Sequence, residues 1–170
     1  MIKKYTLSEA RHVWVISDLH LDHTNIIRYC NRPFGDIDEM NRVLVKNWNE
    51  TVGEDDTVYF LGDMSFGRGS RPASYWVKRL NGRIIYVKGS HDIGVRAPGN
   101  LEVEVNGEAF DMTHDPYLYP HPYGRWVIHG HKHQHRPFVD RRARRVNVSV
   151  EVTGYKPVSL ADIVRSTRNA

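Results

Sequence analysis

Five short hydrophobic runs of this chain are each followed directly by residues of the kinds that bind metal ions. The runs VWVIS, TVYFLG, RIIYVKG, FDMT and RWVIHG are rich in β-branched and aromatic residues, which predicts strands. Several strands of an α/β sheet can deliver side chains to one crevice at their carboxyl ends. We therefore expect the groups that follow the runs to meet at one site: Asp18-x-His20, Gly62-Asp63, Ser90-His91-Asp92, His114 and His131-x-His133.

The types of candidate ligand restrict the metal ions that the site is expected to bind. Carboxylates and imidazoles without a thiolate suit Mn, Fe, Zn, Ni or Co, whereas an all-oxygen site would favour Mg or Ca. Seven candidate ligands exceed what one ion with an open position for water requires, so we expect two divalent ions, with manganese preferred. Asp63 is the expected bridging carboxylate. Such a pair activates a shared hydroxide for in-line attack at phosphorus, which predicts phosphoester hydrolysis without a covalent intermediate.

The ordered motifs DLH, GD, GSHD, a lone His and GHKH resemble those of the calcineurin-like metallophosphoesterase superfamily. The segment DLHLDHTNIIRYCNRPF is also similar to sequences of a small, stand-alone prokaryotic branch of this superfamily. The resemblance implies an α/β fold, a four-layer sandwich of two mixed β-sheets flanked by helices. It implies a first ion held by Asp18, His20, Asp63 and His133, and a second held by Asp63, Ser90, His114 and His131.

The same resemblance implies that His91 contacts the substrate phosphate and helps the leaving group depart. Asp92 is expected to orient backbone or an imidazole, with turn capping as the alternative. His23, one turn beyond His20, is a candidate for substrate binding, with a surface position at a helix start as the alternative. Arg68, in the loop after the GD motif, is a second candidate for substrate binding.

The chain departs from the superfamily pattern at two places. Ser90 stands where the third motif normally has an Asn, and a hydroxyl is a shorter and poorer ligand, so the second ion could be weakly bound, water-bridged or missing. The Asp-Arg-Gly of protein phosphatases is also lacking after Asp63, which leaves the orienting partner of His91 unidentified. A phosphodiesterase or nucleotide phosphohydrolase is therefore favoured over a phosphoprotein phosphatase. The alternative is a metal-binding scaffold or nucleic-acid-binding module of the same fold.

The composition limits the number of domains, the cellular location and the disulfide content that we expect. With 170 residues, 40% of them hydrophobic and 26% charged, the chain is expected to form one domain spanning residues 1–170. No apolar run is long enough for a signal segment or a membrane span, which predicts a cytoplasmic protein without membrane partners. The single Cys30 excludes an internal disulfide framework and a cysteine-based zinc site.

The formal charge of +4 is concentrated in an arginine cluster after the last motif, around an expected hairpin turn. One interpretation is a solvated turn that protects a sheet edge. The other is a rim that attracts phosphate and could hold a nucleotide or a nucleic-acid backbone. The cluster consists of Arg136, Arg141, Arg142, Arg144 and Arg145.

Strands are predicted at residues 12–17, 57–61, 83–88, 101–105, 109–113, 125–129 and 146–152. Met40, Leu44 and Trp48 recur at helical spacing after Asp36, and a second helix is predicted after Pro72. Asn-Gly at residues 106–107 predicts a hairpin. The proline- and tyrosine-rich residues 115–124 could form a wall for a base or aryl group, or a cap over the core.

Overall fold

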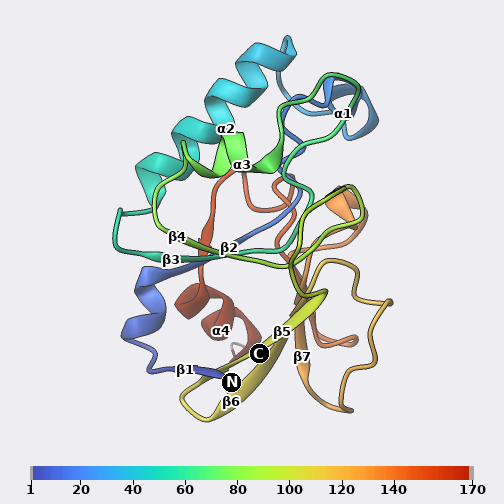
Figure 1. The fold of residues 1–170 in the computed structure, drawn as a ribbon. Helices are drawn as coiled ribbons and strands as arrows, with labels where there is room; N and C mark the ends of the chain where they lie inside the picture. The colour runs from blue at the N-terminus through green and yellow to red at the C-terminus, as the bar shows by residue number, and fades with distance from the viewer. Residues whose placement is uncertain (1, 169–170) are drawn as a thin grey trace.

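The computed structural model describes residues 2–168, which form two mixed β-sheets (Figure 1). The four-stranded sheet has the order β10-β2-β3-β4. Strands β2 (Val13–Ile16), β3 (Thr57–Phe60) and β4 (Arg83–Tyr86) are parallel, while β10 (Val158–Ser159) is antiparallel to β2. The expected α/β class with two mixed sheets is confirmed.

The six-stranded sheet has the order β1-β5-β6-β7-β9-β8. Parallel pairs join β1 to β5, β6 to β7 and β7 to β9, while β5–β6 and β8–β9 are antiparallel. The bounds of the six strands are Lys3–Tyr5 for β1, Asn100–Val105 for β5, Glu108–Thr113 for β6, Trp126–His129 for β7, Val139–Asp140 for β8 and Arg145–Asn147 for β9.

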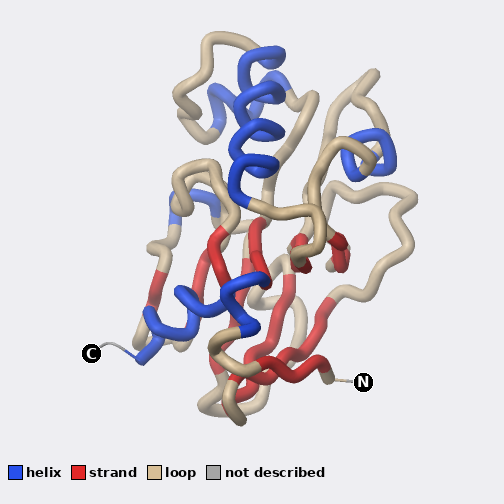
Figure 2. Tube along the Cα trace, turned by 90° about the vertical axis from the view of Figure 1, so that its left-hand side faces the viewer, coloured by secondary structure: helices blue, strands red, loops and turns tan. Residues whose placement is uncertain are grey.

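Helices lie on both sides of the four-stranded sheet, as Figure 1 shows for α2 and α3 above it and α4 below. Figure 2, turned by 90°, shows the strands in the middle and lower part of the molecule with helices above and in front of them. The helices are α1 (Thr24–Tyr29), α2 (Ile37–Thr51), α3 (Ala73–Val77) and α4 (Leu160–Arg168), with two 3-10 helices, η1 (Glu9–His12) and η2 (His133–His135). None of the helices formed by residues 2–168 is both long and apolar enough to cross a membrane.

Helix α2 forms as its sequence predicts. The side chain of Asp36 accepts a hydrogen bond of 2.8 Å from the amide of Glu39, which caps the first turn. Met40, Leu44 and Trp48 are buried on one face and pack in the core that includes Phe60 of β3. The helix is therefore held against the outer face of the four-stranded sheet by its apolar stripe.

A second core lies between the two sheets. It joins Val15 and Tyr59 of the four-stranded sheet to Phe110 and Ile128 of the six-stranded sheet, and Ile163 of α4 packs into it. This shared core packs the sheets face to face, so that loops at the ends of both sheets approach one another.

Strand β9 is shorter than the sequence predicts. Residues 146–152 were expected in one strand, but β9 ends at Asn147. Beyond it the chain crosses toward the other sheet, where the amide of Ser17 donates to Val148 O at 3.1 Å and the amide of Val150 donates to Ser17 O at 3.2 Å. The prediction was wrong for residues 148–152 because these residues connect the two sheets instead of extending one.

The other expected elements agree closely with the structure. The Asn106-Gly107 turn between β5 and β6 has a positive φ at both residues, 49° and 82°, as a tight hairpin of this type requires. The sequence missed β1, β8, β10, α1 and α4. The three strands have only two or three residues each, and pairing with neighbours stabilises them more than local propensity does.

Candidate metal centre

The backbone turns sharply at most of the predicted ligands. Asp18, His20, Asp63, His131 and His133 all have a positive φ, between 44° and 67°. Residues other than glycine rarely adopt this left-handed region, and when they do the residues often belong to functional sites. Each turn ends the extended path of the preceding strand, which lets the side chain point back toward a common centre.

Glycines in the motifs allow the loops to approach closely. Gly62 has a φ of 92°, and a Cβ on it would lie 2.5 Å from the backbone of Gly89. A Cβ on Gly130 would clash with the side chains of Ser17 and Asp18. The GD and GSHD motifs therefore begin with glycine because their backbones are in contact, and the GHKH motif because its backbone lies against the side chains of Ser17 and Asp18.

Three imidazoles are oriented in the same way. His114 Nδ1 lies 2.8 Å from Leu61 O, His133 Nδ1 lies 3.0 Å from Glu151 Oε1, and His20 Nδ1 lies 3.1 Å from His23 Nδ1. An Nδ1–H that donates to an oxygen leaves Nε2 as the free lone pair, which is the arrangement seen in metal-binding histidines. For His114 and His133 these oxygen partners leave Nε2 facing the carboxylates of the site, while the partner of His20 Nδ1 is a nitrogen and its Nε2 lies 3.5 Å from Asp63 Oδ2.

Each of the two carboxylates, Asp18 and Asp63, accepts hydrogen bonds from the protein through only one of its two oxygens. Asp18 Oδ2 accepts hydrogen bonds from Ser149 Oγ at 2.8 Å and from the amide of His131 at 2.9 Å. Asp63 Oδ1 accepts from the amide of His91 at 2.7 Å. The other oxygens, Asp18 Oδ1 and Asp63 Oδ2, face the imidazole nitrogens.

The atoms of the site that have no hydrogen-bond partner are of the kinds that bind divalent cations. In the described part of the chain, Asp18 Oδ1, His20 Nε2 and His114 Nε2 are buried without a hydrogen-bond partner. Asp63 Oδ2 lies 3.5 Å from His20 Nε2 and 3.2 Å from His114 Nε2. Buried polar atoms without partners are costly, and a cation would satisfy all of them at once.

The candidate ligand atoms form two groups that share Asp18. Asp18, His20 and His133 form one, and Asp18, Asp63 and His114 form the other, each with ligand atoms within 4.8 Å of one another. Asp63 also lies beside His20, so both aspartates are placed to contribute to both groups. The residues of both groups are of the kinds that bind divalent cations.

Burial and charge set the protonation of these groups. Burial lowers the pKa of His20 to about 3, so this ring is neutral and ready to bind an ion. Burial also lowers the pKa of His114, but the nearby carboxylates of Asp63, at 3.2 Å, and Asp18 outweigh it and raise this pKa to about 9. A protonated His114 must lose its proton to a bound ion, so metal affinity is expected to rise with pH.

Two of the predicted ligands for the second ion lie outside these groups. His131 packs its ring 5.0 Å from that of His114, but its Nε2 lies 3.6 Å from Asp115 Oδ2 and its side chain is one-third exposed. Ser90 is exposed at the edge of the site. Their assignment as ligands stays a prediction.

Asp92 holds the loops of the site together. Its carboxylate accepts hydrogen bonds from the amides of Asp63, Met64 and Gly89 and from the hydroxyl of Tyr86, at 2.7–3.1 Å. Both oxygens are thus engaged by the chain, which agrees with the expected backbone-orienting role. It joins the second motif to the third.

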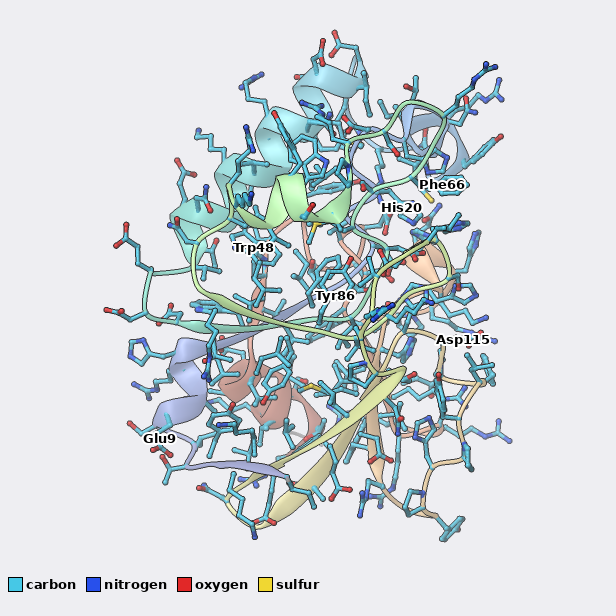
Figure 3. All side chains as sticks on the ribbon, in the orientation of Figure 1. Glu9, His20, Trp48, Phe66, Tyr86 and Asp115 are labelled. Carbon is cyan, nitrogen blue, oxygen red and sulfur yellow. The ribbon has the colours of Figure 1, made fainter. Side chains whose placement is uncertain are left out.

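The ring of His91 packs against an aromatic ring. The Phe66 ring centroid lies 4.2 Å from that of His91, and the His20 ring lies 5.4 Å from it. Figure 3 shows Phe66 close to His20, with Asp115 below them. His91 therefore stands between the metal-type ligands and the residues around Phe66.

His23 and Arg68 lie on the same side of the site. His23 contacts the Nδ1 of His20 at 3.1 Å and the Phe66 ring at 4.9 Å, so it supports a ligand directly. Arg68 lines a cleft of about 980 Å³ that His91 also lines. Apolar side chains form much of its wall, among them Phe66, Val77, Ile93 and Val95. Both residues remain candidates for substrate binding.

The sequence analysis missed Glu151 and Arg32. Glu151 Oε1 accepts from His133 Nδ1 and from Arg32 Nη2, at 3.0 Å and 2.7 Å, and the side chains of Glu151 and Arg32 are almost wholly buried. Arg32 also donates to Asp18 O at 2.8 Å. No local motif marks either residue, because Glu151 reaches the site only after the chain leaves β9. Together they orient His133 and the backbone at Asp18.

Two mixed sheets carry metal-type ligands where their ends meet, and comparison with known proteins identifies the class as that of metal-dependent phosphoesterases. The calcineurin-like phosphoesterase family model matches residues 11–126. An uncharacterised protein of Methanocaldococcus jannaschii is 43% identical over 162 residues, covering 91% of this chain and 90% of the relative. The chain belongs to the calcineurin-like phosphoesterase family.

Two further relatives extend the comparison. The gene 66 protein of Mycobacterium phage L5 is 28% identical over 185 residues, covering 84% of this chain and 88% of that protein. The crystal structure of a protein of unknown function from Aquifex aeolicus superposes with a TM-score of 0.68 at 23% identity, covering 91% of this chain and 98% of that one. The latter supports the fold alone.

Asp63→Asn is expected to remove both ions. Asn can keep an oxygen toward the amide of His91, but its NH2 group then faces the ions as a donor where a carboxylate oxygen is needed. Metal analysis of purified protein should find both sites depleted, whereas Asp55→Asn at an exposed position should retain both. Two ions per chain in the Asp63 variant would overturn the assignment of Asp63.

Glu151→Gln should weaken binding of the ion held by His133 about 10- to 100-fold, because the imidazole loses the carboxylate that makes it more basic. The variant also leaves the buried Arg32 without its charge partner, so its melting temperature should fall. Metal titration at a temperature where circular dichroism finds both proteins folded separates the two effects. Glu54→Gln, at an exposed position, is the control. Unchanged affinity with a lower melting temperature would limit Glu151 to a structural role.

Proposed function

We propose that this protein is a dinuclear metal-dependent phosphodiesterase that hydrolyses its substrate by direct attack of water on phosphorus. The observation that carries the proposal is the orientation of His20, His114 and His133, whose Nε2 atoms converge on the carboxylates of Asp18 and Asp63. Manganese is the ion that we expect in both positions, with Fe, Ni, Zn or Co also compatible with this ligand set.

When bound, the two ions would acidify the attacking water and stabilise the charge on the phosphate oxygens. The residues of the chain have separate tasks. Asp18, Asp63, His20, His114 and His133 hold the ions, with His131 and Ser90 as further ligands of the second. Asp92 fixes the loops that carry Asp63 and Ser90, through its hydrogen bonds to backbone amides.

His91 is the residue that we expect to touch the substrate phosphate. Its backbone amide donates to Asp63, and its ring packs against Phe66 in a tilted arrangement, so we expect it to lie beside the ions without serving as a ligand. In that position an imidazole can donate a proton to the departing oxygen as the ester bond breaks. His23 contacts His20, and we expect it to be a second residue that binds the substrate.

The cleft next to His91 is suited to the group esterified to the phosphate. Its volume of about 980 Å³ matches that of ligand pockets in general, and its mixed wall offers apolar contacts from Val77 and Ile93 together with the cation of Arg68. A diester carries a substituent on each side of phosphorus, so one substituent can occupy this cleft.

The proposal is tested with metal-loaded protein and a panel of aryl phosphate monoesters and diesters. We expect hydrolysis of diesters in preference to monoesters. His91→Ala should lower kcat about 10²- to 10⁴-fold while the metal content stays unchanged. His12→Ala, a histidine exposed far from the ligands, should leave kcat unchanged. Full metal loading with no turnover on any ester would instead support the metal-binding scaffold. Loss of metal in the His91 variant would make His91 a ligand.

Ser90→Asn tests the second ion. An Asn carries an amide oxygen further into the site than the Ser hydroxyl and is the better donor to a divalent ion. Ser90 is exposed, so a larger side chain has room. We expect tighter binding of the second ion and faster diester hydrolysis, measured at matched metal concentrations. Ser90→Ala, which removes the hydroxyl, should have the opposite effect. If all three proteins bind and turn over equally, residue 90 is not a ligand.

A further inference from the structure

Exposed aromatic and basic residues gather beside the metal centre, on the side away from the cleft. Tyr117 is 55% exposed and Tyr123 is wholly exposed at the ends of one loop. Leu118 of the same loop is exposed as well, so this loop holds three of the six large hydrophobic side chains exposed among residues 2–168. Such a concentration is unusual for a surface without a partner.

Cations surround both tyrosines. Lys132 Nζ lies 4.9 Å from the Tyr117 ring centroid, and the Arg145 guanidinium carbon lies 4.1 Å from it. Arg145 also lines a hollow of about 300 Å³ with Tyr123, Arg142 and Arg144. We call these six residues the Tyr117 surface: Tyr117, Tyr123, Lys132, Arg142, Arg144 and Arg145.

Most of this positive charge is not neutralised locally. Arg125, at the floor of the hollow, pairs with Glu102 and Asp111 at 2.8 Å and 3.0 Å. Arg144 donates to the backbone oxygen of Gly124 at 2.8 Å, which holds the guanidinium beside the loop without cancelling its charge. Asp140 is the single acidic residue in residues 136–145. The surface therefore offers cations to an anionic ligand.

The Tyr117 surface is continuous with the metal centre. Lys132 stands between His131 and His133 in the sequence, and with Tyr117 and Arg145 it lines a second, smaller hollow. Arg145 lines both hollows, so a path of cations leads from the metal-type ligands to Arg142. A chain of phosphates could follow this path into the site.

Protection of a sheet edge explains part of this arrangement. The turn that carries Arg142 and Arg144 joins β8 to β9, and β8 is the last strand of the six-stranded sheet. Charged residues at such an edge discourage pairing with other chains. This explanation accounts for arginines anywhere on the turn, but not for two exposed tyrosines placed among them.

We propose that the Tyr117 surface binds single-stranded nucleic acid and leads its phosphodiester backbone toward the metal centre. Cations that follow a backbone, with aromatic rings on which unpaired bases stack, are the means by which proteins bind single strands without reading sequence. Cleavage of the strand rests on the proposed function above. Binding does not, because it needs neither turnover nor metal.

Binding is measured on the full-length protein in EDTA by fluorescence anisotropy of a labelled 12-nucleotide DNA, at several salt concentrations. We expect affinity that falls steeply as salt increases, because bound phosphates release their counterions. A duplex of the same sequence should bind more weakly, since its paired bases cannot stack on tyrosine. No binding of the single strand at low salt, or equal binding of the duplex, would overturn the proposal.

A triple variant tests the arginines. Arg142→Ala, Arg144→Ala and Arg145→Ala together should reduce the slope of log K against log salt by about 2, at roughly 0.7 for each phosphate that is no longer neutralised. Lys3→Ala, Arg11→Ala and Arg42→Ala remove the same charge from exposed positions elsewhere and should leave the slope nearly unchanged. Equal effects of the two triple variants would mean that net charge alone attracts the strand, against the proposal.

Stacking is tested separately. Tyr123→Ala should weaken binding roughly five-fold or more, whereas Tyr123→Phe should retain it, because a phenyl ring stacks without the hydroxyl. Equal affinity of the Ala and Phe variants would remove Tyr123 from the site. Hydrolysis of a small aryl diester gives the independent readout. Hydrolysis of the diester without strand binding would reject only the proposal that the Tyr117 surface binds nucleic acid. Strand binding without hydrolysis would reject only the proposed phosphodiesterase function.

Discussion

The structure depends on two buried carboxylates, each of which has one oxygen hydrogen-bonded to the protein and one oxygen that is not. Asp18 and Asp63 each bind protein donors with one oxygen and keep the other for the centre. Burying a carboxylate is costly unless it is compensated. Here the compensation comes from neighbouring imidazoles, whose proton balance depends on the same oxygens. An arrangement of this kind is complete only with a cation in it. The loops around the site are therefore shaped for a ligand, and their conformations make little sense as packing alone.

The backbone at the site carries the strain of this arrangement. Left-handed conformations at Asp18, Asp63 and His133 cost of order 1–3 kcal/mol each, and they persist because surrounding contacts hold them. Asp92 supplies one set of contacts and Glu151 with Arg32 supplies another. Left-handed backbone conformations at the site thus coincide with buried hydrogen-bond networks. Rigid placement of ligands is the result.

The sequence predicts the centre of the site better than its surroundings. Asp63 and His114 follow hydrophobic runs, so the rule that ligands gather at strand ends finds them without knowledge of the fold. Glu151 and Ser149 could not be found in this way, because they act on His133 and Asp18 across long separations in the chain. The contact of Phe66 with His91 could not be predicted for another reason: an aromatic residue gives no sequence pattern that separates core packing from contact with a histidine ring.

The candidate ligands come from both sheets, so bound ions would connect the two sheets physically. Asp18, His20 and Asp63 follow strands of the four-stranded sheet, while His114 and His133 follow strands of the six-stranded sheet. Ions at this seam would act as a cross-link between the two halves of the sandwich, much as a disulfide joins distant segments. The two sheets should then unfold as one cooperative unit when the ions are bound, and chelation should loosen one sheet from the other before either melts.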